Sequence, residues 1–398
     1  MAISIPINRF YLSHRKHKGG DFMGAYDVYG NIITPHDING FYCQAYDING
    51  NLLTGDYNIA SSGYERSILS ARDSWIAESR ADISIVPVVV HADQHGRLTA
   101  NNSLFAYLSK AVPWADISAC IGLGDTTDYS ETAFQNMVAC LKGAPKNKQI
   151  NIWGNHDTWT YNWYRDIAIP TAEEMGVLNT YFDNSAFNGN YKYNDYGIEC
   201  MVDEAKRIKY VVIGGWEYDL TLGYHSHYVI SSDGMEDIIQ MLSVPDNYDI
   251  VILSHLQPFS NQKVSDWYHP PVEDGNVQGG SGGMNIGVGN VADVSISQML
   301  IDRKNKTSGT VKDSYGNSHA YDFTGCNSDL LCCFAGHEHC DKYMWQNGNI
   351  PVYLFDAYAY DNHPFYFVNI DRTKERLNIW KVDDVPTVYN YQIPFNQQ

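Results

Sequence analysis

Short apolar runs rich in β-branched residues recur along the chain and alternate with segments of helical periodicity. The apolar runs cover residues 83–91, 117–124, 149–155, 209–215, 249–255 and 330–337. The helical patterns cover residues 63–79, 101–112, 129–142 and 234–242. Strands that alternate with helices are typical of an α/β domain, in which helices cover a sheet. The alternation therefore predicts an α/β fold for most of the chain.

The C-terminal part has a different pattern. After residue 350, the runs PVYLFDAYAY, PFYFVNI and RLNIWKV follow one another with only turn residues between them. We expect these runs to form consecutive antiparallel strands.

The amino-acid composition limits the partners and the cellular compartment that fit this chain. With 398 residues, of which 44% are hydrophobic, the chain can bury a large core. A formal net charge of −19 argues against nucleic acid or a membrane as partner, because both require basic patches. We find no apolar stretch near the ~18 residues of a membrane span and no signal-peptide pattern, which favours a cytoplasmic protein. The eight cysteines include no CxxC pair and are interpreted as reduced thiols.

The sequence predicts that residues 1–62 form a separate β appendage to a domain of residues 63–398. AYDVYGNII (25–33) is followed by the similar AYDINGNLL (45–53), and both have turn signals between apolar residues. This repeat predicts two related β-hairpins. They would serve self-association or attachment to a particle, or would only cap the main domain. Calcium binding is a weaker alternative, because tight turns also use Asp and Asn.

A glycine-rich insertion spans residues of about 258–328 and contains DGNVQGGSGGMNIGVGN. Long loops inside compact domains are often functional. The segment lies between two apolar runs that end in histidines, so we expect a loop over an active site, with a passive insertion as the alternative.

Five apolar runs end in residue types that bind metal ions. The residues are Asp93 and His95; Asp125 and Asp128; Asn155, His156 and Asp157; His255; and His337 and His339. Ligands of α/β sheets bind beyond the carboxyl ends of the strands, so these residues should meet at one edge. A lone histidine or Gly-Asp pair is usually structural. Five such elements in one chain are more readily explained by a shared metal site.

The ordered motifs D-x-H, G-D-x-x-D, G-N-H-D, a later lone His and G-H-x-H resemble the signature of the calcineurin-like metallophosphoesterase superfamily. The resemblance covers residues of roughly 83–385. It implies a four-layer α/β/β/α sandwich, in which two mixed sheets pack face to face with metal ions at their carboxyl edge. The N-terminal appendage and the glycine-rich insertion lie outside the shared pattern.

The resemblance also implies a ligand set for two divalent ions. It places Asp93, His95 and His339 on one ion, Asn155, His255 and His337 on the other, and Asp125 on both. We expect His337 and His339 to project from one extended backbone segment, since residues i and i+2 of a strand share a side. Gly336 would let the backbone approach closely or turn tightly.

Carboxylate, imidazole and amide ligands together suit Mn²⁺, Fe or Zn²⁺ better than Mg²⁺ or Ca²⁺, and we favour Mn²⁺. Such an ion pair attracts a phosphoester, and a hydroxide bridging the ions would attack phosphorus in line. His156 is expected to contact the phosphoryl group and protonate the leaving oxygen. Asp128 or Asp157 would orient it.

Two observations bear on the substrate. Tyr129 and Ser130 replace the Arg-Gly that follows G-D-x-x-D in protein Ser/Thr phosphatases, and the G-N-H-D form favours the phosphodiesterase branch. We therefore predict hydrolysis of a phosphodiester or a small phosphoester. An alternative is a phage tail or baseplate protein of the virion that carries a phosphoesterase domain, because the chain has 30 Tyr, 32 Gly and a hairpin repeat.

Overall fold

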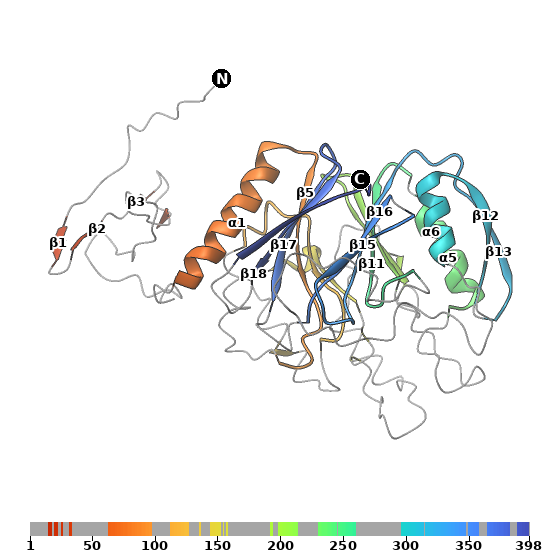
Figure 1. Ribbon diagram of the computed structural model, residues 1–398, viewed down its shortest axis with the longest axis horizontal. Coiled ribbons are helices and arrows are strands. Elements are labelled where there is room, and N and C mark those ends of the chain that lie inside the picture. Colours follow the sequence, from red (N-terminus) through yellow and green to blue (C-terminus); the bar gives the residue numbers. More distant parts are fainter. Residues whose placement is uncertain are drawn as a thin grey trace. The chain divides into compact units, whose positions relative to one another are not determined.

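The structure is a computed structural model (Figure 1), and it describes a set of separate residue ranges. The described residues are 15–17, 20–22, 25–26, 32–33, 63–97, 112–126, 135–136, 144–152, 154, 157, 192–193, 198–213, 230–244, 246–259, 296–313, 315–347, 349–357, 364–382 and 388–397. The chain divides into the units Met1–Ser70 and Ala71–Gln398. The predicted boundary after residue 62 stays a prediction.

Among its described residues, the N-terminal unit contains two antiparallel strand pairs. They are β1 (Arg15–His17) with β2 (Gly20–Phe22), and β3 (Ala25–Tyr26) with β4 (Ile32–Ile33). Tyr26 pairs with Ile32, so the sequence DVYGN connects β3 to β4. The first predicted hairpin, over residues 25–33, is therefore confirmed. The second, over residues 45–53, lies outside the described residues.

The described part of the second unit is built around two large mixed sheets, as the resemblance implied. One sheet has the strand order β15-β16-β14-β11-β10-β9-β8, and the other has the order β19-β18-β17-β5-β6-β7. The first consists of β8 (Lys192–Tyr193), β9 (Ile198–Asp203), β10 (Ile208–Ile213), β11 (Asp249–Ser254), β14 (Leu330–Ala335), β15 (Lys342–Gln346) and β16 (Ile350–Leu354). The second consists of β5 (Ile85–His91), β6 (Ala119–Gly122), β7 (Gln149–Asn151), β17 (Phe365–Asp371), β18 (Arg376–Val382) and β19 (Val388–Pro394).

Each sheet contains a series of neighbouring strands that run parallel to one another. They are β5, β6 and β7 in one sheet, and β10, β11, β14 and β16 in the other. Within each sheet, the carboxyl ends of these strands therefore meet at one edge. The second sheet also contains the antiparallel series β5-β17-β18-β19. The prediction that the strands after residue 350 form one antiparallel series is wrong for β16, which pairs parallel with β14 in the other sheet.

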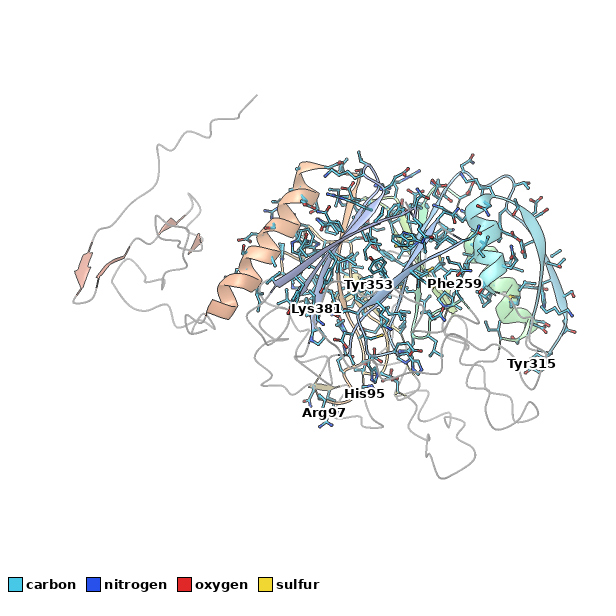
Figure 2. The ribbon with its side chains drawn as sticks, in the orientation of Figure 1. His95, Arg97, Phe259, Tyr315, Tyr353 and Lys381 are labelled. Carbon is cyan, nitrogen blue, oxygen red and sulfur yellow. The ribbon has the colours of Figure 1, made fainter. Side chains whose placement is uncertain are left out.

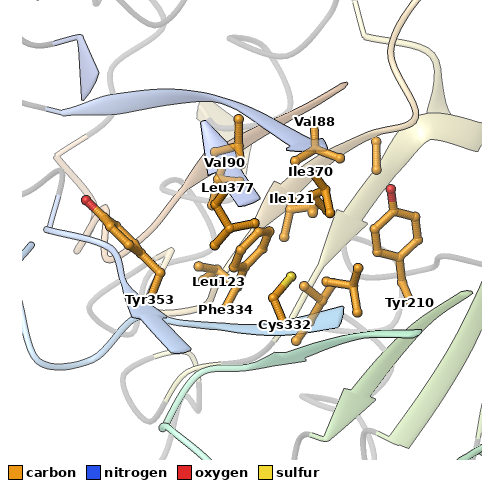
Figure 3. Close-up of a cluster of buried hydrophobic side chains, with 14 of the residues drawn as sticks. Val88, Val90, Ile121, Leu123, Tyr210, Cys332, Phe334, Tyr353, Ile370 and Leu377 are labelled. Atoms are coloured by element: carbon orange, nitrogen blue, oxygen red, sulfur yellow. The ribbon is translucent and has the colours of Figure 1, made fainter. Parts of the chain in front are cut away.

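The inner faces of the two sheets share one apolar core. Figure 3 shows Val90 and Ile121 of one sheet together with Tyr210, Phe334 and Tyr353 of the other. All five side chains are buried. Parallel strands between two layers are covered on both faces, which explains the nearly unbroken apolar runs in the sequence.

Helix α1 (Gly63–Ala81) covers the outer face of the six-stranded sheet from Ala71 onwards. Trp75 stacks on Phe367 with ring centroids 4.8 Å apart, and its indole Nε1 donates to Val368 O (3.0 Å). The amide Nδ2 of Asn369 donates in return to Trp75 O (2.9 Å). The predicted helix over residues 63–79 is thus confirmed and extends to Ala81.

Helices α5 (Ser232–Ser243) and α6 (Ile296–Asn305) pack on the outer face of the seven-stranded sheet (Figure 1). Strands β12 (Ser308–Lys312) and β13 (Ser318–Asp322) form a hairpin beside them. From Ile296 onwards the expected glycine-rich insertion is therefore regular structure on this outer face. Residues 260–295 lie outside the described residues.

The β12–β13 loop repeats the motif of the N-terminal hairpin. Lys312 pairs with Ser318 around the loop DSYGN, which has the same length as DVYGN. The Asp313 carboxylate accepts from the amides of Tyr315 and Asn317, both at 2.9 Å. It also accepts from Asn317 Nδ2. The aspartate of this motif therefore serves the turn itself.

Two expectations from composition can be compared with the described residues. The helices among them lack the combination of length and hydropathy needed to cross a membrane. The described cysteines are thiols rather than disulfides.

Candidate metal centre

The metal-binding residue types follow strands β5, β6, β11 and β14, and main-chain hydrogen bonds fasten these strand ends together. Asp93 N donates to Gly124 O (3.0 Å), His95 N to Asp125 O (2.8 Å), and Gly336 N to His255 O (3.0 Å). The first two bonds link neighbouring strands of one sheet, and the third links neighbouring strands of the other. Each side chain is therefore held by a backbone that has little freedom to move.

Six of the seven predicted ligands lie together in two groups. Asp93, His95, Asp125 and His339 form one, and Asp125, His255 and His337 form the other. Within each group, one ligand atom from every residue lies within 4.8 Å of all the others. Asp125 belongs to both groups, as the resemblance implied. Figure 2 shows His95 below Tyr353 and Lys381.

The remaining predicted site residues have a different status. Asn155, His156 and Asp128 lie outside the described residues, so their roles stay predictions. Asp157 is described and buried, and its Oδ2 accepts from Gly154 N (2.7 Å). This hydrogen bond therefore joins the first and last residues of the G-N-H-D motif.

Imidazole nitrogens face the two carboxylates. His339 Nε2 lies 3.3 Å from Asp93 Oδ1, and Asp125 Oδ2 lies 3.4 Å from His255 Nε2 and 3.6 Å from His95 Nε2. The Nε2 atoms of His95 and His339 are 3.0 Å apart. Asp93 and Asp125 are at most 1% exposed. Two carboxylates buried this close together require compensating positive charge.

The tautomer of His255 follows from its surroundings. Its Nδ1 lies 2.8 Å from Leu123 O. A carbonyl can only accept, so Nδ1 carries a proton and Nε2 is directed towards Asp125. Metal-binding histidines are commonly oriented in this way, with one nitrogen bonded to a carbonyl and the other towards the ion.

The charges act on the two facing histidines in opposite directions. Burial lowers the pKa of His255, but the Asp125 and Asp93 carboxylates and the Leu123 carbonyl together outweigh this effect and raise the pKa to about 9. Burial, with the positive charge of His255 close by, lowers the pKa of His337 to about 4. A metal ion binds the neutral ring, so an ion in this group would replace the proton on His255.

Five of the site residues have left-handed backbone conformations. Their φ angles are 52° for Asp93, 44° for His95, 51° for Asp125, 68° for His337 and 49° for His339. This conformation is unfavourable for residues with a Cβ atom and costs roughly 1 kcal/mol or more at each position. Strain of this kind is found preferentially at functional sites.

The left-handed conformations correct one prediction. His337 and His339 do not extend strand β14 but lie in a bend after it. The two rings still reach different groups: His337 contacts His255 edge to face at 5.1 Å, and His339 contacts His95 at 4.9 Å. The bend after β14, rather than an extended strand, therefore places the two histidines in different groups. Their assignment to two different ions stays a prediction.

Glycines provide the space that the carboxylates occupy. A Cβ atom on Gly336 would lie 2.6 Å from Asp93 Oδ2. A Cβ atom on Gly154 would lie 2.0 Å from Asp125 Oδ1. Both distances are too short for any side chain, so the close approach predicted at Gly336 is confirmed, and Gly154 has the same role.

One cation near the site was not predicted from the sequence. Arg97 follows His95 in a tight turn, in which Arg97 N donates to Gln94 O (2.8 Å). Its side chain is exposed, and no acidic side chain among the described residues forms an ion pair with it. Figure 2 shows Arg97 beside His95. The only sequence feature that singles Arg97 out is its position two residues after the predicted ligand His95.

The described residues fit two adjacent divalent ions. Each group supplies carboxylate oxygen and imidazole nitrogen, and the Asp125 carboxylate lies in both groups. A shared carboxylate is the usual way to hold two ions about 3.5–4 Å apart. This donor set does not identify the metal.

Comparisons with known proteins concern the fold only. No family model and no curated protein sequence matches the chain. Solved structures similar to it include a dimetal phosphatase from Danio rerio, with 11% identity, a TM-score of 0.45 and coverage of 78% of this chain and 99% of that one. They also include a purple acid phosphatase from yellow lupin, Lupinus luteus, with 11% identity, a TM-score of 0.43 and coverage of 78% and 54%. A third is GAP50, the anchor in the inner membrane complex of Plasmodium, with 11% identity, a TM-score of 0.42 and coverage of 79% and 90%.

Gly154→Ala should reduce metal binding, because the added methyl group would displace the Asp125 carboxylate. We expect bound Mn²⁺ to fall from about two ions per chain to about one or fewer, as measured by elemental analysis after desalting. Gly325→Ala is the control, because a Cβ atom there meets nothing within 4 Å. Equal metal content in the two variants would contradict the role of Asp125.

Proposed function

We propose that the protein is a phosphoester hydrolase that uses two divalent metal ions. The observation that supports this proposal most directly is Asp125, whose buried carboxylate belongs to two separate groups of ligand-type residues. A structural zinc site would instead use one closed set of four ligands, commonly including cysteine. A pair of ions that share a carboxylate is typical of phosphoester hydrolysis.

The proposed ligands are those that the motifs predict. Asp93, His95 and His339 would hold one ion, His255, His337 and Asn155 the other, and Asp125 both. When bound, the ions would supply an activated water molecule and neutralise the phosphate oxygens. Mn²⁺ is the metal we propose, with Fe and Zn²⁺ as the other ions that suit these donors.

The protein residues would orient the substrate and move protons. His156 follows the ligand Asn155 and would donate a proton to the leaving oxygen, with Asp128 holding its ring in position. Arg97 would bind a substrate oxygen that carries negative charge. Because the chain has a net charge of −19, a cation beside the ions would add to their attraction for an anionic substrate.

The proposed substrate is a phosphodiester or a small phosphoester. We also propose that residues 1–62 are separate from the hydrolase domain of residues 63–398. Nothing among the described residues favours the phage-particle alternative, so we do not carry it forward.

Metal analysis and a substrate panel test the proposal together. After loading with Mn²⁺, we expect about two ions per chain, because the ligands form two groups. We expect metal-dependent hydrolysis within a panel of mono- and diester chromogens, nucleotides, cyclic nucleotides and glycerophosphodiesters. Chelation should abolish this activity and added Mn²⁺ should restore it. A loaded protein without bound metal, or without activity on the whole panel, would refute the proposal.

His156→Ala should separate chemistry from metal binding. The variant should keep both ions but lose ~10²–10⁴-fold in rate, which is the usual contribution of a general acid. The loss should be larger for an alkyl ester than for an activated phenyl ester, because a phenolate leaves without a proton. Asp125→Ala is the contrasting variant and should lose metal. If the rate fell equally on the alkyl and phenyl esters, His156 would bind the phosphoryl group but would not act as the general acid.

Arg97→Ala should raise the KM for small anionic phosphoesters roughly tenfold, because it removes one charge-assisted hydrogen bond. Arg97→Lys should recover part of this loss, since it keeps the charge without the planar guanidinium. Arg80→Ala is the matched control, because Arg80 is exposed and pairs with Asp116 on the surface. A KM unaffected by Arg97→Ala would exclude contact between this side chain and the substrate.

A further inference from the structure

A buried cluster of charged and phenolic side chains joins the two sheets near the metal centre. Lys381 of β18 and Tyr366 of β17 come from the six-stranded sheet. Tyr353 of β16, Asp356 just after β16 and Asp341 just before β15 come from the seven-stranded sheet. Figure 2 shows Lys381 beside Tyr353 between the sheets. None of these residues belongs to the ligand motifs.

The hydrogen bonds of the cluster converge on Asp341. Its Oδ2 accepts from Lys381 Nζ, and its Oδ1 accepts from the hydroxyls of Tyr366 (2.5 Å) and Tyr353 (3.3 Å). Lys381 Nζ also donates to Asp356 Oδ2 (3.0 Å), and Asp356 N donates to Tyr366 OH (3.1 Å). Asp341 thus binds three residues from the two sheets.

Stability alone is a poor explanation for this cluster. Asp341 is 8% exposed and Lys381 is 5% exposed, so both charges have lost most of their hydration. Replacing a buried ion pair by apolar side chains of similar volume is often neutral or stabilising. A buried pair is better explained when it fixes one arrangement of the chain.

The location of Asp341 indicates which arrangement is fixed. The segment Gly336 to Asp341 runs from the end of β14 to the start of β15 and contains both His337 and His339. At its first end, His337 N donates to both carboxylate oxygens of Asp93, at 3.1 and 3.0 Å. At its other end, Asp341 is held by Lys381. Both histidines have left-handed conformations, which persist only where the surroundings hold them.

We propose that Asp341 and Lys381 are positioning residues of the metal centre, which hold the far end of the histidine segment so that His339 stays directed towards Asp93. His339 Nε2 is 3.3 Å from Asp93 Oδ1, and His339 is only two residues from Asp341. Loss of the ion pair between Asp341 and Lys381 would let the segment Gly336 to Asp341 relax. His339 would then move away from Asp93. This inference rests on the metal site of the proposed function.

Two amide substitutions in the same cluster provide the test. Asp341→Asn and Asp356→Asn each remove one carboxylate that binds Lys381, and both preserve side-chain volume. Only Asp341 lies on the histidine segment. We expect Asp341→Asn to weaken the binding of one of two Mn²⁺ ions by about 10–100-fold, the usual effect of losing an outer partner of a ligand. Asp356→Asn should leave both affinities unchanged. Calorimetric titration with Mn²⁺ measures them.

Lys381→Met should reproduce the effect of Asp341→Asn. Lys374→Met is its control, because Lys374 lies at the opposite end of the β17–β18 hairpin, is 55% exposed and pairs with Asp371 at 3.5 Å. Circular dichroism would confirm that each variant is folded. If Lys381→Met fails to fold, the isosteric Asp341→Asn decides the question alone.

The inference would be overturned if folded Asp341→Asn bound two Mn²⁺ ions with wild-type affinities, or if Asp356→Asn lost as much affinity as Asp341→Asn. Either result would mean that the cluster stabilises the fold but does not position His339. The titration uses Mn²⁺ without substrate. A wild-type protein that binds two ions but hydrolyses no phosphoester would therefore refute the proposed function and leave this inference intact.

Discussion

Two buried carboxylates at the edge where strand ends meet impose the main constraint on this structure. Asp93 and Asp125 are almost completely removed from water, yet both belong to one group of ligand-type atoms. Such a pair of charges is unfavourable unless positive charge is supplied in the same place. Four imidazoles surround them, and the glycines at 154 and 336 leave room for the carboxylate oxygens. The backbone around these groups is strained, since five of the site residues have left-handed conformations.

The sequence predicted the parts of this arrangement that depend on residue type. Buried parallel strands require apolar residues on both faces, so strands such as β5 and β14 stand out as unbroken runs. The residues that follow them have distinctive chemistry, and six predicted ligands do lie together. The left-handed conformations of His337 and His339 could not be predicted, because the bend that contains them is held by distant residues, such as Asp93, which accepts from His337 N.

The sequence also could not predict which of the two sheets each strand joins. Strand β16 has the same composition as the strands that follow it, yet it lies in the other sheet because it pairs with β14. Likewise, α6 and the β12–β13 hairpin follow a glycine-rich stretch that gave no sign of regular structure nearby. The role of Lys381 depends on contacts with Asp341 and Asp356, which no local pattern reveals. Long-range packing decides each of these features.

The pairing of β5 with β17 has a consequence for biosynthesis. Strand β5 lies between β6 and β17, and β17 begins at Phe365, far from β5 (Ile85–His91) in the sequence. A ribosome that has made the first half of the protein has therefore exposed strands that still lack their neighbours. The six-stranded sheet can close only after β19, which ends at Pro394, has left the exit tunnel. Pairing across so long a stretch is slow, and the waiting strand edges are prone to aggregation until it occurs.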